Sequence, residues 1–130
     1  MHLAAALALL ALAAPAQVQD APQRSENAVQ VSAGLVCDTP KQIERYVELF
    51  RGNARAAAAA VNAEEGKAEA CVIGRVAFIR GENVTRIKSV ADEAVQIAEI
   101  FVVAVATPGG MQPIEPVRWY TIFAVEETEA

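Results

Sequence analysis

The sequence is poor in the side chains that most enzymes use for catalysis. Its one histidine, His2, lies inside an apolar N-terminal run that we expect to be removed. Without His2 the chain has no imidazole, which excludes Ser-His-Asp and Cys-His catalysis and histidine-ligated zinc or iron. Two cysteines far apart in sequence form no C-x-x-C pair for a zinc ribbon or an iron–sulfur cluster. The sequence therefore predicts a protein without a cofactor or metal and without enzymatic activity.

Phosphate-binding loops are also missing, and a catalytic pair of carboxylates, although possible in principle, is not favoured. The segment 107–113, TPGGMQP, has neither G-x-x-x-x-G-K-[ST] nor G-x-G-x-x-G spacing and is typical of a hairpin connection. The acidic pairs at 64–65 and 92–93 fall in apparent surface loops. Glu99 interrupts an apolar stretch, which leaves two interpretations: a carboxylate at the rim of a sheet, which we favour, or a buried carboxylate with a raised pKa.

Positive charge is scarce as well. Eleven Lys and Arg against sixteen Asp and Glu give a formal net charge of −5. An acidic domain lacks the clustered cations that bind nucleic acid through its phosphates, so we expect no nucleic-acid partner. After the first residues no apolar run is long enough to anchor the chain in a membrane.

The N-terminal run indicates export. Leu3 to Ala14 is uncharged, too short to span a bilayer and of the length of a signal-peptide core. The A-x-A pattern that ends at Ala16 predicts a signal peptide over residues 1–16, cut between Ala16 and Gln17. The run lacks the usual preceding Lys or Arg, and its alternative is a buried Ala/Leu helix. With export, the mature protein is periplasmic or secreted.

Cys37 and Cys71 are the only cysteines. An even count in a short exported chain predicts a disulfide. Closing this loop stabilises the fold by about 3–4 kcal/mol in the chain-entropy estimate. The alternative is a reactive Cys37 thiol near a helix N-terminus, but the neighbouring Asp38 carboxylate opposes a lowered thiol pKa.

The best-specified helix begins after Thr39. Thr39 is a good N-cap, Pro40 suits the first helical position, and Gln42 can complete a capping box. An apolar stripe follows at helical spacing, with Gly52 as the stop, and we expect ion pairs Lys41–Glu44 and Glu48–Arg51. An Ala-rich second helix is predicted from 54 to about 62, capped by Asn53, and residues 64–67 are predicted as a surface loop.

The remainder is predicted as strands, at 29–36, 70–80, 84–88, 95–106 and 117–125, with a turn at Gly81–Asn83. In the second of these, Val72, Val76 and Phe78 are expected to face inward. We predict an α+β fold in which the helices pack on an antiparallel sheet of four or five strands. The alternative is a small SH3-like barrel with an added helix. Residues 17–30 are expected to form a flexible arm, and 31–127 a single domain.

Two groups of residues are candidates for a binding surface. Arg80, Arg86 and Lys88 are expected near the end of one hairpin, where they could dock an acidic partner or an anionic envelope polymer. The alternative, which the pattern favours, is a solvated face of the sheet. Trp119 and Tyr120 follow Arg118, and these residue types are enriched in interface hot spots. The alternative is a core position for Trp119 with Tyr120 at its rim.

The strings VCDTPKQIERYVELF, AAVNAEEGKAEACVIGRVAFIRGENV and WYTIFAVEE resemble a set of small exported proteins of Gram-negative bacteria for which no activity is established. The resemblance covers roughly residues 34–127, and its most specific marks are Cys37-Asp38-Thr39 and Ala70-Cys71. It implies export and a pairing of the cysteines, and it brings no catalytic residue.

The leading hypothesis is an exported, non-enzymatic domain that binds another macromolecule in the cell envelope. Two alternatives stay open: a thiol redox protein that uses Cys37 and Cys71, and a small-ligand-binding module. The sequence does not identify the partner or the oligomeric state.

Overall fold

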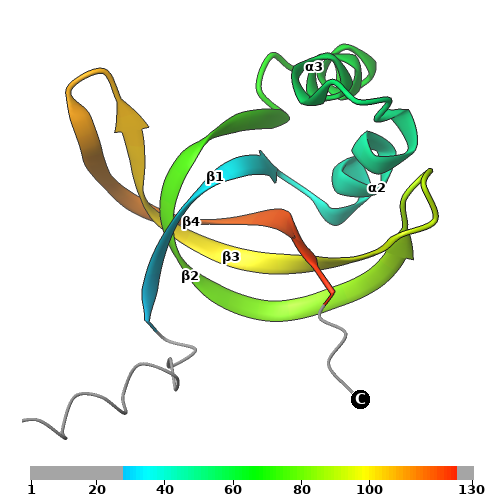
Figure 1. Ribbon diagram of the computed structural model, residues 1–130. Coiled ribbons are helices and arrows are strands. Elements are labelled where there is room, and N and C mark those ends of the chain that lie inside the picture. The colour runs from blue at the N-terminus through cyan, green and yellow to red at the C-terminus, as the bar shows by residue number, and fades with distance from the viewer. Residues whose placement is uncertain (1–27, 126–130) are drawn as a thin grey trace, which may run out of the picture.

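The computed structural model describes residues 28–125, so the predicted signal peptide, its cleavage between Ala16 and Gln17 and residues 17–27 of the predicted arm lie outside the described part. Figure 1 shows the two helices together at one end of a strongly curled sheet. Strand β1 begins two residues before the predicted start of the domain. The elements in chain order are β1 (Val29–Cys37), α2 (Pro40–Leu49), α3 (Ala54–Glu65), β2 (Cys71–Lys88), β3 (Ala94–Thr107) and β4 (Gly110–Ala124).

All four strands are antiparallel to their neighbours and follow the order β1-β2-β3-β4. The sheet curls until β1 meets β4, where Cys37 pairs with Tyr120 and closes a barrel. The predicted α+β class is confirmed, with four strands in the described part. The β3–β4 connection at 108–109 falls where the TPGG stretch predicted it.

Helix α2 starts where the sequence predicts. The Thr39 hydroxyl accepts from the Gln42 N–H, and the Gln42 side chain accepts from the Thr39 N–H, so the capping box is complete. Ile43, Tyr46 and Val47 form its buried stripe. Each of these features depends on residues within one or two helical turns, which explains why the sequence alone predicts them.

Three expectations about the helix surfaces are wrong. Glu48 pairs with Arg45 rather than with Arg51, and the pair Lys41–Glu44 is not among the ion pairs of the described residues. The Arg51 side chain donates to backbone carbonyls instead, because the helix has already ended at Leu49. Residues 64 and 65 continue α3 rather than forming a loop, since both carboxylates accept hydrogen bonds from α2.

The predicted turn at Gly81–Asn83 is also wrong. Strand β2 runs without interruption for 18 residues, and its register against β3 shifts on both sides of Asn83. Such irregularities bend a strand and increase its twist, which lets β2 wrap around the barrel. Gly81 lies against the Glu99 carboxylate and the Phe101 ring, so a side chain there would require those groups to shift. The actual connection between β2 and β3 lies at Ser89–Glu93.

Apolar side chains gather on both faces of the sheet, since neighbouring residues on a strand point to opposite faces. The helix-side cluster joins α2 and α3 to residues such as Leu35 and Ile97. The strand-only cluster contains Val76, Phe78, Ile100 and residues of β1 and β4. Val72 was expected to face inward with Val76 and Phe78, but it is 36% exposed and belongs to neither cluster.

Candidate functional site

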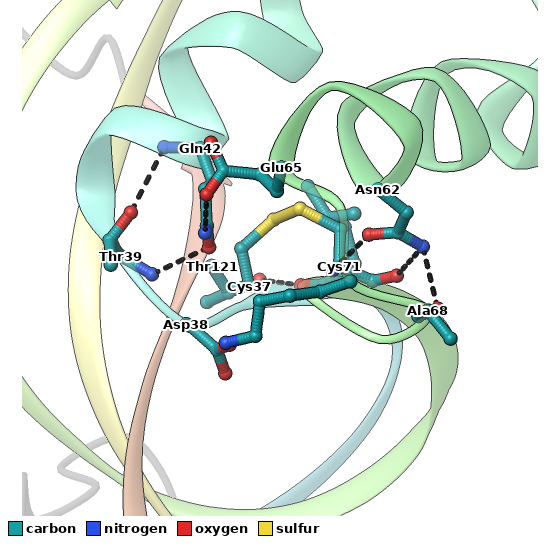
Figure 2. The surroundings of a disulfide bond; sticks show 11 residues. Cys37, Asp38, Thr39, Gln42, Asn62, Glu65, Ala68, Cys71 and Thr121 are labelled. Atoms are coloured by element: carbon teal, nitrogen blue, oxygen red, sulfur yellow. Dashed lines mark hydrogen bonds and ion pairs between the residues drawn. A yellow bond between two sulfur atoms is a disulfide. The ribbon is translucent and has the colours of Figure 1, made fainter.

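A buried disulfide joins β1 to β2 beneath the helices (Figure 2). Cys37 and Cys71 are directly opposite in the ladder, their Cα atoms are 4.0 Å apart, and each residue is 1% exposed. The predicted pairing is confirmed. A thiolate nucleophile must reach its substrate, and neither sulfur lies at the surface, so the geometry favours a structural bridge over a redox centre.

Asn62 holds the region around the disulfide and was missed by sequence reasoning. Its Oδ1 accepts from the Cys71 N–H at 2.7 Å, and its Nδ2 donates to the carbonyls of Cys71 and Ala68, each at 3.0 Å. Figure 2 shows these bonds fixing the start of β2 to α3. The only sign of this role in the sequence was the presence of a polar residue within an Ala-rich helix. A polar residue exposed on the helix surface would give the same pattern.

An exposed ion-pair group joins the two helices. Arg45 contacts Glu64 through two N–H groups, each at 2.9 Å, and Glu48 through a third. The Arg45 guanidinium lowers the pKa of Glu64, and the carboxylates raise that of Arg45, by charge-assisted hydrogen bonding. These side chains are in contact with solvent, so the network links α2 to α3 rather than forming a reactive site.

The seam between β1 and β4 is the most distinctive feature of the sheet. In the described residues the two strands pair only at Cys37–Tyr120, and the Thr121 hydroxyl donates to the Leu35 carbonyl beside this pair. The remainder of β1 pairs with β2 on one side and with no described strand on the other.

Alternate residues of β1 direct their backbone groups toward this seam. In an antiparallel ladder only every second residue pair exchanges backbone hydrogen bonds. The Asp38 N–H donates to the Ala70 carbonyl, so the next pair, Cys37–Cys71, is non-hydrogen-bonded. The register runs unshifted back to Val29. The residues whose N–H and C=O point away from β2 are therefore Val29, Val31, Ala33 and Leu35.

A groove of about 310 Å³ lies along the seam. One wall is β1 from Ser32 to Val36, the other is β4 from Thr121 to Phe123, and Phe78 and Ile100 line it between them. Gly34 faces open space, because a Cβ built there has no atom within 4 Å. The volume is at the lower end of the range for ligand-binding pockets.

The predicted binding residues separate into different surroundings. The Arg80 guanidinium lies 4.0 Å from the centre of the Phe123 ring, which lines the groove. Arg86 donates to Gln96, the cross-strand partner of Phe123, at 3.4 Å. Lys88 pairs with Asp92 in the β2–β3 connection instead.

The predicted aromatic patch divides between the two faces of β4. Trp119 packs on the strand-only cluster and Tyr120 on the helix-side cluster, because they are neighbours on one strand. The core alternative for Trp119 therefore describes the fold better than a shared surface patch does.

Glu99 does not lie at an edge with its carboxylate in water, because β3 pairs with strands on both sides. Its carboxylate is 3.2 Å from Arg118 Nε and accepts from the Glu82 N–H at 3.2 Å, and its side chain is 19% exposed. It does not line the seam groove. Both carboxylate oxygens therefore have partners within the protein, and one of them, the Glu82 N–H, lies in the irregular part of β2.

A second apolar cleft, of about 430 Å³, separates the end of α2 from the β2–β3 connection. Phe50, Val90 and Ile122 line it, and Val90 is largely exposed. Among residues 28–125 no group of three or more His, Cys, Asp and Glu is placed to hold a metal ion. Within the same range no helix has the length and apolar character needed to cross a membrane.

Comparison with protein-family models, with curated proteins and with solved structures finds no match to this chain.

Proposed function

We propose that this chain is an exported, non-enzymatic domain that binds another macromolecule of the cell envelope at the seam groove. The observation that carries the proposal is the combination of an apolar groove with an edge of β1 that, before Cys37, pairs with no strand among residues 28–125. Natural proteins usually protect such an edge with charges, prolines or bulges. The segment Val29–Val36, VQVSAGLV, has no charge and no proline, and its register is regular.

The Cys37–Cys71 disulfide supports export, because disulfides form and persist in oxidising compartments such as the periplasm. The uncharged N-terminal run and its A-x-A pattern support the same conclusion. We further propose that the signal peptide is removed after Ala16, which leaves β1 close to the mature N-terminus.

Site-specific photocrosslinking in the envelope fraction of the source cells tests this function. A benzophenone side chain at Ala33 samples the groove, and the same group at Val84, an exposed position on β2, is the control. We expect a discrete adduct from position 33 only. Gly34→Val should abolish it, since a Cβ at this position has open space, the larger side chain then occupies the groove, and strands favour β-branched residues.

Equal labelling from both positions, or no adduct at position 33, would contradict the proposal. Thermal unfolding of Gly34→Val controls for folding: its melting temperature must equal or exceed that of the unmodified protein.

A small apolar ligand is the second candidate, favoured by the cleft beside Val90. A ligand that binds only the folded state raises the melting temperature. A metabolite panel that raises it, with the shift lost in Val90→Asp, supports this candidate.

A further inference from the structure

We infer that the seam groove receives an extended acidic segment of a partner polypeptide, which adds to the free edge of β1 as a strand and places its carboxylates on Arg80 and Arg86. This inference rests on the proposed function and names the chemistry of the partner.

The backbone of β1 sets the form of the occupant. The outward N–H and C=O groups of Val31 and Ala33 have no described strand partner, and they repeat at the two-residue spacing of a β-ladder. An extended peptide satisfies such a row with its own backbone, as in strand addition to a sheet edge. Anionic polymers without peptide groups lack this alternation of donors and acceptors.

The two faces of β1 offer contacts for alternate side chains of the added strand. On one face Val29 and Val31 are 57% and 54% exposed, although both are apolar. On the other face the groove widens at Gly34, where the missing side chain leaves room. A strand with apolar residues at alternate positions would cover the valines and fill this space.

Charge complementarity favours acidic residues in the partner segment. The protein carries a net charge of −5, yet neither Arg80 nor Arg86 forms an ion pair with a described carboxylate. Arg80 stacks on the ring of Phe123, which lines the groove. Arg86 lies further along the same row of the sheet and contacts Gln96, the cross-strand partner of Phe123. Arg80 Nη2 donates one hydrogen bond to Asn83 Oδ1 at 2.8 Å, and Arg86 Nε donates one to Gln96. Each guanidinium has five N–H groups, so further donors remain for a carboxylate.

A random decapeptide library displayed on phage, selected against the oxidised full chain, tests the inference. We expect enrichment of Asp and Glu with alternating apolar residues. In the synthetic peptides, backbone N-methylation should weaken binding at every second residue, which is diagnostic of strand pairing. Arg80→Gln with Arg86→Gln should weaken binding about tenfold. Lys67→Gln, which also removes one exposed positive charge but lies outside the groove lining, should leave it unchanged.

On the protein side, Ala33→Pro removes one outward N–H. Because proline is tolerated where an edge N–H faces solvent, the β1–β2 ladder is kept. We expect Ala33→Pro to abolish peptide binding while the disulfide still forms. If this variant does not fold, the N-methylation pattern carries the same test independently.

The outcomes separate the inference from the function it rests on. Selected peptides that bind without enrichment of acidic residues, or whose binding is not weakened at every second N-methylated residue, overturn the inference. If Gly34→Val still abolishes the binding of such peptides, the groove remains a binding site and the proposed function stands. A heparin fragment that displaces the peptides equally well would identify a general anion site and overturn strand addition. No enrichment at all overturns the inference, and the crosslinking result then decides the function separately.

Discussion

Replacing both cysteines by alanine should destabilise this domain severely. The bridge closes a loop of 34 residues in sequence separation, for which the chain-entropy relation gives about 4 kcal/mol. That amount is a large share of the roughly 5–15 kcal/mol that keeps a domain folded. The bridge also lies at the one residue pair that closes the barrel, since Cys37 pairs with both Cys71 and Tyr120.

For a domain near 100 residues this loss corresponds to a melting temperature lower by roughly 15–30 °C. Differential scanning calorimetry of Cys37→Ala/Cys71→Ala against the oxidised protein measures it. Urea unfolding adds a second test, because an unfolded chain without the cross-link exposes more surface and should raise the m-value. A melting temperature lowered by less than about 5 °C, with an unchanged m-value, would refute the reasoning that the bridge constrains the unfolded chain.

Three further predictions concern side chains around α2 and α3. Asn62→Ala should lower the free energy of unfolding by about 2–4 kcal/mol in urea denaturation, because it leaves the buried Cys71 backbone without partners; a loss under about 0.5 kcal/mol would contradict this. Thr39→Ala removes the helix cap and should cost about 1 kcal/mol, whereas Thr39→Ser should restore it, by the same assay. Arg45 lowers the pKa of Glu64, so the ion pair stabilises the fold fully at pH values above the ordinary carboxyl pKa, and this stabilisation is lost as the pH falls through the lowered pKa of Glu64. The difference in melting temperature between wild type and Glu64→Gln should therefore shrink in acid. A difference that grows in acid would contradict this prediction.

The features that the sequence predicted correctly are the ones encoded locally or by simple counting. The Thr39 capping box and the stripe on α2 depend on residues within a few positions of one another. The disulfide was predicted from there being only two cysteines in a short chain with a predicted export signal. The turn between β3 and β4 was marked by Pro108 and Gly109.

The features that were missed depend on long-range contacts. Gly81 suggested a turn, but it lies within a continuous strand, against the carboxylate of Glu99, which is distant in sequence. The role of Asn62 depends on where β2 starts. The seam follows from the curl of the whole sheet, which no single strand encodes, so the free edge of β1 had no signal in the sequence beyond its lack of charge.

The opposed positions of Cys37 and Cys71 have a consequence for how the chain folds. A slip of one residue between β1 and β2 would move one sulfur to the other face of the sheet. The two cysteines can therefore form the bond only when the two strands are correctly aligned. Once formed, the bond excludes slipped alignments from every later refolding event, so a protein that opens transiently in an oxidising compartment returns to the same strand pairing and the same free edge.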